Sequence, residues 1–213
     1  MDKSVKAANK IKIEKVIKGL EKRNMTGYYC DSRGEALELI MSMIPRGAAV
    51  GCGYSVTMDE IGVREALRKG DYDFTDPFVF SEREESLAAR KKALRSDVFL
   101  SGLNAVTMDG EIVNIDGTGN RVAGIIFGPD KVILAAGANK IVPYEKDAVD
   151  RIRSDACPAN CIRLGKKTPC AFSGKCADCL IKGNTVCGHI VTTRFSATDG
   201  RIHVVLINEA LGY

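Results

Sequence analysis

The stretch GAAVGCGYSVT, residues 47–57, decides the fold class, because it reads as a short buried strand followed by a glycine turn and the start of a helix. The small and apolar residues 47–51 predict the strand, and a helix is predicted from Thr57 to Gly70. Glycine permits the positive φ angles and the close backbone approach that such a turn needs. A strand that turns directly into a helix is typical of the βαβ units of α/β proteins.

The same alternation continues on both sides of this stretch. Ser32 and Glu35 have the spacing of a capping box, so they mark the start of a further helix, which is predicted to end near Pro45. Strands that alternate with helices of roughly 10–15 residues imply parallel pairing. The other predicted strands are 26–30, 71–74, 97–101 and 131–136, and the other predicted helices are 6–23, 82–94 and 144–154.

Two segments depart from this alternation and predict antiparallel hairpins. Residues 104–116 form two alternating runs around Asp109-Gly110, a dipeptide typical of hairpin turns. Residues 186–194 and 201–207 predict a second hairpin, joined near Asp199-Gly200. The expected architecture is one α/β domain over residues 1–213, with a mostly parallel, Rossmann-like sheet and added antiparallel hairpins.

The glycine turn is the first candidate binding site. Gly51 and Gly53 allow a ligand to approach the backbone, and free amides at the start of the next helix attract anions. Ser55 and Thr57 supply hydroxyls for a phosphate or a carboxylate. The alternative is a tight turn in which a hydroxyl only caps the helix, because the sequence matches neither the dinucleotide-binding nor the Walker A pattern.

A second glycine-rich segment, residues 116–121, is the other candidate. Its guanidinium is predicted to clamp a carboxylate or a phosphate through two parallel hydrogen bonds. The alternatives are a mobile turn, a turn cap and a surface ion pair. The predicted ligand-binding residues here are Asn104, Gly117, Gly119, Asn120 and Arg121. We expect the two glycine segments to meet at one edge of the sheet, with Asn139 and Lys140 as weaker candidates beside them.

Six of the eight cysteines lie between residues 157 and 187, a segment that is also rich in Lys, Gly and Pro. Cys176 and Cys179 form a C-x-x-C pair, whose turn suits a shared metal ion. The predicted metal ligands are Cys170, Cys176, Cys179 and Cys187, and four thiolates suit zinc or an iron–sulfur cluster. Disulfides, a redox switch or unpaired reduced thiols are the alternatives, and Cys157 and Cys161 offer other ligand sets.

Composition narrows the class of protein. The formal net charge is +4, from 31 basic and 27 acidic residues that are mostly interspersed, and there is no Trp. Nucleic acid is therefore not an expected partner, because no basic patch is interleaved with aromatic residues. No apolar stretch is long enough to span a bilayer or to resemble a secretory signal, so the expected location is cytoplasmic.

Residues 97–142, including SGLNAVTMDGEIVNIDGTGNRVAGIIFGPDKVILAAGANKIV, resemble the core signature of the LUD (lactate utilisation) family. The match is carried by residues 104–106, 110–113, 116–121 and 137–140, and the loop 51–62 resembles an earlier loop of that family. The resemblance implies a sheet related to that of the sugar-phosphate isomerase and CoA-transferase superfamily. It also implies a role in the oxidation of lactate to pyruvate beside iron–sulfur partner proteins.

Three functions follow as hypotheses. The first is a component of a lactate-oxidising system that binds a small anionic ligand in a glycine-lined cleft. The second is a non-catalytic, metal-binding or iron–sulfur partner subunit. The third is a transferase, isomerase or hydrolase acting on a phosphorylated or CoA substrate, argued from the fold alone. The resemblance transfers no catalytic residue, and both catalysis and homo-oligomer formation stay open.

Overall fold

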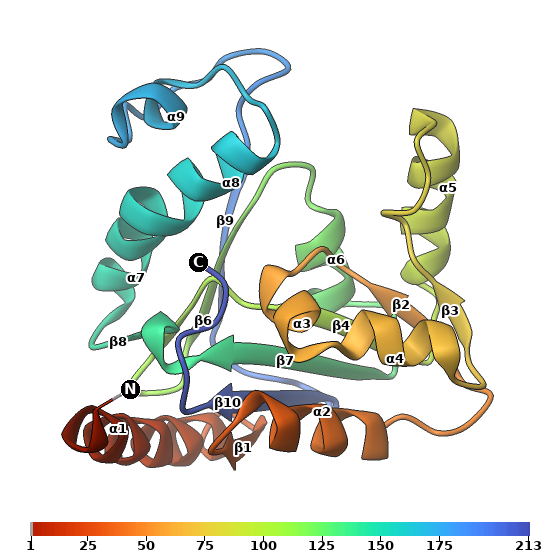
Figure 1. Ribbon diagram of the computed structural model, residues 1–213, viewed down its shortest axis with the longest axis vertical. Helices are drawn as coiled ribbons and strands as arrows, with labels where there is room; N and C mark the ends of the chain where they lie inside the picture. Colours follow the sequence, from red (N-terminus) through yellow and green to blue (C-terminus); the bar gives the residue numbers. More distant parts are fainter. Residues whose placement is uncertain (1) are drawn as a thin grey trace.

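A parallel β-sheet of six strands forms the centre of the structure, a computed structural model that describes residues 2–213 (Figure 1). The strand order is β1-β10-β7-β4-β2-β3, and every neighbouring pair is parallel. The mostly parallel α/β sheet predicted from the sequence is therefore confirmed. The strands are β1 (Thr26–Cys30), β2 (Ala49–Cys52), β3 (Asp73–Thr75), β4 (Val98–Gly102), β7 (Lys131–Gly137) and β10 (Ile202–Ile207).

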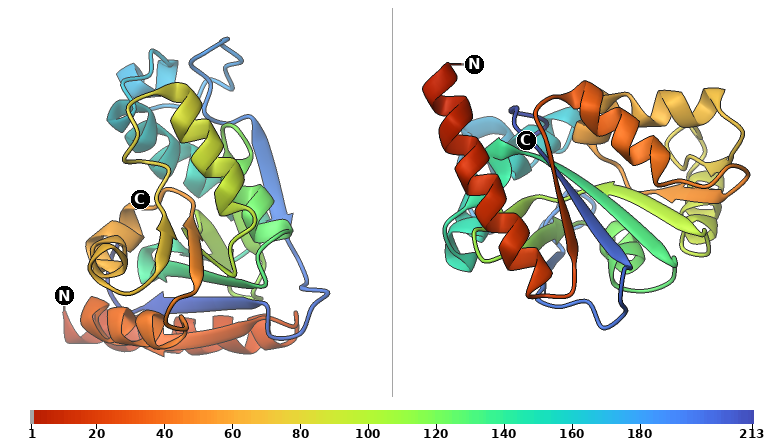
Figure 2. Two further views of the ribbon diagram at one scale, coloured as in Figure 1. Left: turned by 90° about the vertical axis from the view of Figure 1, so that its right-hand side faces the viewer. Right: turned by 90° about the horizontal axis from the view of Figure 1, so that it is seen from below.

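Helices cover both faces of this sheet (Figure 2). On one face, α2 (Arg33–Ser42), α3 (Val56–Ile61) and α4 (Val63–Lys69) pack on a core that includes Leu100 and Ile133. On the other face, α1 (Lys3–Glu21), α5 (Arg83–Ala93) and α6 (Asn120–Ile126) contribute to a core that includes Phe99 and Leu134. Successive strand residues thus serve opposite cores, as the two-residue repeat of a strand requires.

A smaller mixed sheet stands beside the central one, with the order β8-β5-β6-β9. Its strands are β5 (Ala105–Thr107), β6 (Ile112–Asp116), β8 (Ile141–Val142) and β9 (His189–Thr193). One face carries α7 (Glu145–Arg151), a π-helical turn η2 (Ile152–Ala156) and the start of α8 (Cys157–Arg163). The short 3-10 helix η1 (Ala138–Lys140) links β7 to β8, and α9 (Pro169–Ser173) follows α8 (Figure 1).

The first predicted hairpin is confirmed. β5 and β6 are antiparallel, with Ala105 opposite Val113. Gly110 has a φ of 87°, which a glycine adopts without strain. The Asp109-Gly110 turn therefore fixes this register, as its sequence predicts.

The second predicted hairpin is wrong. β9 pairs antiparallel with β6 in the small sheet, whereas β10 lies between β1 and β7 in the central sheet and is parallel to both. Residues 194–201 connect the two sheets rather than two neighbouring strands. The burial of β10 explains its position, since Val204 to Ile207 are fully buried and an apolar run of this kind is typical of a central parallel strand.

The predicted helix from Thr57 to Gly70 is two helices, α3 and α4. Gly62 has a φ of 92°, so it ends α3 in a left-handed conformation, and α4 begins at the next residue.

Among residues 2–213, no helix has the length and apolarity that crossing a bilayer demands.

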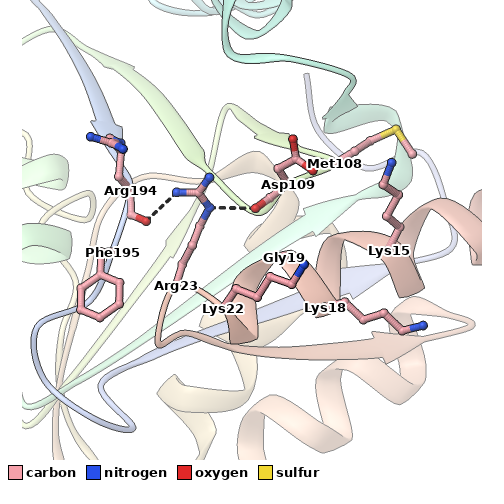
Figure 3. Close-up of a pocket in the computed structure, with 9 residues that line it drawn as sticks. All are labelled: Lys15, Lys18, Gly19, Lys22, Arg23, Met108, Asp109, Arg194 and Phe195. Carbon is pink, nitrogen blue, oxygen red and sulfur yellow. Dashed lines mark hydrogen bonds between the residues drawn. The ribbon is translucent and has the colours of Figure 1, made fainter.

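Helix α1 meets the β5–β6 turn at a glycine (Figure 3). A Cβ atom on Gly19 would overlap the backbone of Asp109, and one on Gly110 would overlap the backbone of Gly19. Arg23 closes the same contact, because its Nε donates to the carbonyl of Asp109 at 2.7 Å and its Nη1 to that of Arg194 at 2.9 Å. The two glycines therefore set how closely the small sheet lies against α1.

Gly19→Ala is expected to lower the free energy of unfolding by about 1–3 kcal/mol, because the added methyl group forces two backbones apart. The measurement is chemical denaturation. Gly34→Ala is the matched control in an exposed helical site, where the nearest atom to the new Cβ is the Ser32 hydroxyl at 3.7 Å. We expect that control to be neutral or stabilising by up to about 1 kcal/mol. Equal effects of the two substitutions would contradict the close-approach explanation.

Candidate functional site

A cleft of about 890 Å³ lies at the carboxyl ends of the central strands. Tyr54 and Ser55 follow β2, residues 102–104 end and follow β4, and Lys140 belongs to the helix after β7. Residues 115–118, 120 and 121, of the small sheet and of α6, form a further wall, and residues of α8 with residues 183, 185 and 186 also line the cleft. The carboxyl edge of a parallel sheet is where ligands of α/β proteins usually bind.

Both glycine segments reach this cleft, although not all of the predicted residues do. The predicted residues that line it are Ser55, Asn104, Gly117, Asn120 and Arg121. Those that do not are Gly51, Gly53, Thr57 and Gly119. The expected meeting of the two segments at one sheet edge is thus what the structure has, while their binding of an anion stays a prediction.

The first glycine segment serves packing more than it exposes amides. The Gly53 amide donates to the carbonyl of Leu100 at 2.9 Å, so it is not free for an anion. A Cβ on Gly53 would lie 2.7 Å from Cγ of Arg121, and one on Gly51 would lie 2.6 Å from the carbonyl oxygen of Ala93. The hydroxyl of Ser55 accepts from the amide of Met58 at 3.2 Å and so caps α3. Here the capping alternative describes the turn well.

The Arg121 guanidinium is engaged on every side by the protein. Its Nη1 donates to the Gly102 carbonyl at 3.1 Å and to Oδ1 of Asn114 at 2.6 Å. Its Nη2 donates to Oδ1 of Asn104 at 2.8 Å and to the Ile115 carbonyl at 2.9 Å. Its Nε lies 3.4 Å from Oδ2 of Asp116.

The four Nη N–H groups of Arg121 thus all have protein acceptors, and its Nε faces a carboxylate. Arg121 has a positioning role in this arrangement, while its predicted clamp on a ligand stays a prediction. The side chain links β4 of the central sheet to β6 of the small sheet. Asp116 completes the link, because its carboxylate also accepts from the amides of Gly119 and Val122 at the start of α6.

Lys140 is the unusual charge of the cleft. Its side chain is only 4% exposed, and Nζ donates to the hydroxyl of Thr57 at 2.8 Å and to the Leu103 carbonyl at 3.3 Å. Within residues 2–213, no carboxylate oxygen lies within 4.0 Å of this nitrogen. Burial lowers the pKa of Lys140 to about 7, the nearby positive charges of Arg151 and Arg121 add to the effect, and Glu60 opposes it.

Aromatic and cationic side chains that the sequence did not single out line the opposite side. The Arg163 guanidinium lies 3.9 Å from the centre of the Tyr54 ring, and Tyr54 contacts Phe78 edge-to-face at 5.1 Å. Burial raises the pKa of the Tyr213 hydroxyl, and the Arg163 charge partly offsets this. These residues are far apart in sequence and share no motif, so only the fold could bring them together.

The charge of the cleft is strongly unbalanced. Its basic lining residues are Arg83, Arg90, Arg121, Lys140, Arg163 and Lys166, whereas Asp116 is the one acidic residue among those that line it within the described chain. Asp116 is itself occupied by Arg121 and by backbone amides. A cleft with this excess of positive charge favours anions over cations or neutral ligands.

A second hollow lies between α1 and the β5–β6 turn (Figure 3). It has a volume of about 790 Å³ and is lined by Lys15, Lys18, Gly19, Lys22, Arg23, Met108, Asp109, Arg194 and Phe195. The three lysines that line it are exposed, and Arg23 already pairs with Glu111 at 3.1 Å. The cleft with the buried lysine is therefore the stronger candidate site.

Four thiols of the cysteine segment lie near one another, because Cys157 is within electrostatic reach of Cys161, Cys170 and Cys187. Sγ of Cys187 lies 3.3 Å from Sγ of Cys157, and Sγ of Cys170 lies 3.7 Å from Sγ of Cys161. Across residues 2–213, no three His, Cys, Asp or Glu side chains are gathered in a way that could hold a metal ion. The predicted ligand set Cys170, Cys176, Cys179 and Cys187 is not gathered around one point within residues 2–213, and its binding of a metal stays a prediction.

Two isolated thiols serve the core. Cys30 is 2% exposed. Cys52, at the glycine turn, is 3% exposed, and burial raises the pKa of its thiol to about 12. A thiol in this state is protonated near neutrality and is a poor nucleophile.

Comparison with known proteins identifies the family. A family model described as the LUD domain matches residues 13–207, so the chain belongs to the LUD-domain family. No curated protein matches the sequence.

Among solved structures, the chain is similar to a DUF162 family protein from Deinococcus radiodurans, with 14% identity and a TM-score of 0.51 over 95% of this chain and 98% of that one. At this identity the likeness concerns the fold alone. A match to eIF2B delta from Chaetomium thermophilum has 16% identity and a TM-score of 0.35, covers 66% of this chain and 54% of that one, and carries no argument here.

Arg121→Met is expected to lower the free energy of unfolding by about 3–5 kcal/mol, because it removes the cation that pairs with the buried Asp116 carboxylate. Denaturant titration followed by circular dichroism measures the loss. Arg83→Met is the matched control, since Arg83 lines the same cleft but is exposed. We expect that control to lie within about 0.5 kcal/mol of the parent. A small effect of Arg121→Met would show that the guanidinium does not join the two sheets.

Proposed function

We propose that this LUD-domain protein takes part in lactate utilisation and that its cleft binds a small organic carboxylate, of the 2-hydroxy or 2-oxo acid type. The family supports the general role. The proposal for the ligand rests on the cleft, because its basic lining and its place at the carboxyl ends of the strands favour a small anion.

The buried ammonium of Lys140 is the observation that carries the proposal. A charge taken out of water is costly unless an opposite charge lies beside it, and Lys140 has only a hydroxyl and a carbonyl as close partners. A ligand carboxylate in the cleft would supply that opposite charge. Binding would then be coupled to protonation of Lys140, because the anion favours the charged form of the amine.

Lys140 is held in place by Thr57, which is itself bonded to the C-terminal segment of the chain. Thr57 of α3 is fully buried, and its hydroxyl donates to the Leu211 carbonyl at 3.3 Å while it accepts from Lys140. Asn139 supports the same chain segment, because its Oδ1 accepts from the Leu211 amide at 3.1 Å. Thr57 therefore acts as a positioning residue rather than as a ligand contact, which differs from the role expected from its motif.

Arg163 is the second cation that we place on the ligand. Its Nη2 donates to Oδ1 of Asn160 at 2.7 Å, and its guanidinium packs against the ring of Tyr54. Stacking on an aromatic ring orients a guanidinium without consuming its donors in the ring plane. Two cations that line one cleft suit a carboxylate better than a neutral molecule.

Lys140→Met is expected to weaken binding of lactate or pyruvate at least tenfold, because it removes the buried charge while keeping a similar length. Isothermal titration calorimetry at pH 6.5 with lactate, pyruvate and inorganic phosphate measures the affinities. Lys131→Met is the matched control, since Lys131 begins the same strand, β7, and donates to the Met43 carbonyl far from the cleft. Unchanged affinity in Lys140→Met, or no binding of either acid by the parent, would contradict the proposal.

The affinity for a carboxylate is expected to depend on pH. The pKa of Lys140 is about 7 and the ligand stays ionised from pH 6 to 9, so the charge of this amine changes within that range while the charge of the ligand does not. Affinity should be constant below pH 7 and should fall up to tenfold for each pH unit above it, as the ammonium loses its proton. Titrations at pH 6, 7, 8 and 9 measure this profile. An affinity that rises with pH would refute the role of Lys140.

A further inference from the structure

The geometry points to a reversible disulfide between Cys157 and Cys187, formed by mild oxidation at the wall of the cleft. Cys157 begins α8, and Cys187 lies just before β9. Their sulfur atoms are 3.3 Å apart. A disulfide bond is about 2.05 Å long, so the two atoms need to approach by only about 1.3 Å. A change of this size is within reach of small side-chain rotations.

The two chain segments that carry these thiols are already held together. Nη2 of Arg153, just before α8, donates to Oδ1 of Asp178 at 2.7 Å. Lys166 and Lys167, just after α8, bond to residues 183 and 184 at 3.0 Å each. These contacts fix the segment 178–184 against α8 on both sides of Cys157. The thiols thus meet without a large rearrangement of the chain.

The C-x-x-C pair, in contrast, is not poised in this way. Sγ of Cys176 accepts from the amide of Asp178 at 3.5 Å, and neither Cys176 nor Cys179 has a sulfur partner among the contacts described for residues 2–213. Sequence spacing alone pairs Cys176 with Cys179. The fold instead joins two cysteines that are 30 residues apart.

The chemistry is thiol–disulfide exchange with a small external disulfide. Two thiols lose two protons and two electrons as the Cys157–Cys187 bond forms, and the reagent accepts them and leaves as two small thiols. The neighbours of the link belong to the cleft: Cys157, Thr185 and Val186 all line it. Oxidation would therefore link α8, which also carries Asn160 and Arg163, covalently to the segment that precedes β9.

The test is oxidation of the purified full chain with oxidised glutathione, followed by digestion without reduction and peptide mass spectrometry. We expect one dominant cross-linked peptide pair joining Cys157 to Cys187, reversed by dithiothreitol. The link should raise the melting temperature by roughly 5–10 °C. Cys187→Ser and Cys157→Ser should each abolish both effects, whereas the control Cys176→Ser should keep them.

Three outcomes would overturn the assignment. The first is a dominant Cys176–Cys179 link. The second is full retention of the free thiols at Cys157 and Cys187 after oxidation. The third is stoichiometric zinc or iron in the purified protein that is lost in the Cys187→Ser variant, which would make these thiols metal ligands. The Cys157–Cys187 peptide decides the question in each case, and a folding failure of one serine variant leaves the parent's peptide map as the readout.

Discussion

One buried guanidinium determines the relation between the two sheets. Arg121 donates to the end of β4 in the central sheet and to β6 in the small sheet, and it is held by Asp116. Because its four Nη N–H groups all donate to protein acceptors, it behaves as a fixed part of the framework. Removing it would leave the buried Asp116 carboxylate without its cation, which costs far more than the loss of one surface ion pair. The wall of the cleft is built on this contact.

A second buried positive charge in the same region, that of Lys140, has no carboxylate partner among residues 2–213. Lys140 lies within the electrostatic reach of Arg121 and Arg151, is buried as deeply, and has no carboxylate beside it. Arg121 has an acceptor for each Nη N–H group and belongs to the framework of the cleft. Lys140 lacks an opposite charge nearby in the described chain and is the part of the cleft that we expect to bind a ligand. A protein gains nothing in stability from such a lysine, and charges of this kind are therefore more often functional than structural.

Much of the central fold could be read from local patterns. The buried runs 131–136 and 97–101, the glycine turn and the Asp109-Gly110 hairpin each have a short-range signal that the structure follows. The partner of β10 could not be read in this way, because a continuous apolar strand fits a hairpin edge or a sheet centre equally well until its neighbours are known. The helix break at Gly62 could not be predicted either, because a single glycine within an apolar helical pattern does not indicate a positive φ.

The position of the two glycine segments could be predicted from the sequence, whereas the contacts of their residues could not. The two glycine segments could be placed at one sheet edge because parallel strands share their carboxyl ends. The roles of Gly53 and Arg121 depended on which hydrogen bonds the fold would satisfy internally, and a sequence does not reveal that. Tyr54, Arg163 and Tyr213 come together only through tertiary packing, and Cys157 approaches Cys187 for the same reason.

The place of β10 in the sheet has a consequence for how the chain reaches its native state. β1, formed near the start of the chain, has β10 as its one neighbour in the described sheet, and β10 is the last strand in chain order. During synthesis on a ribosome, residues 26–30 therefore wait with unpaired edges until residues 202–207 emerge. Such long-range closure slows folding and leaves an early strand open to mispairing, so α1, which packs directly on β1, has a protective part to play before the sheet is complete.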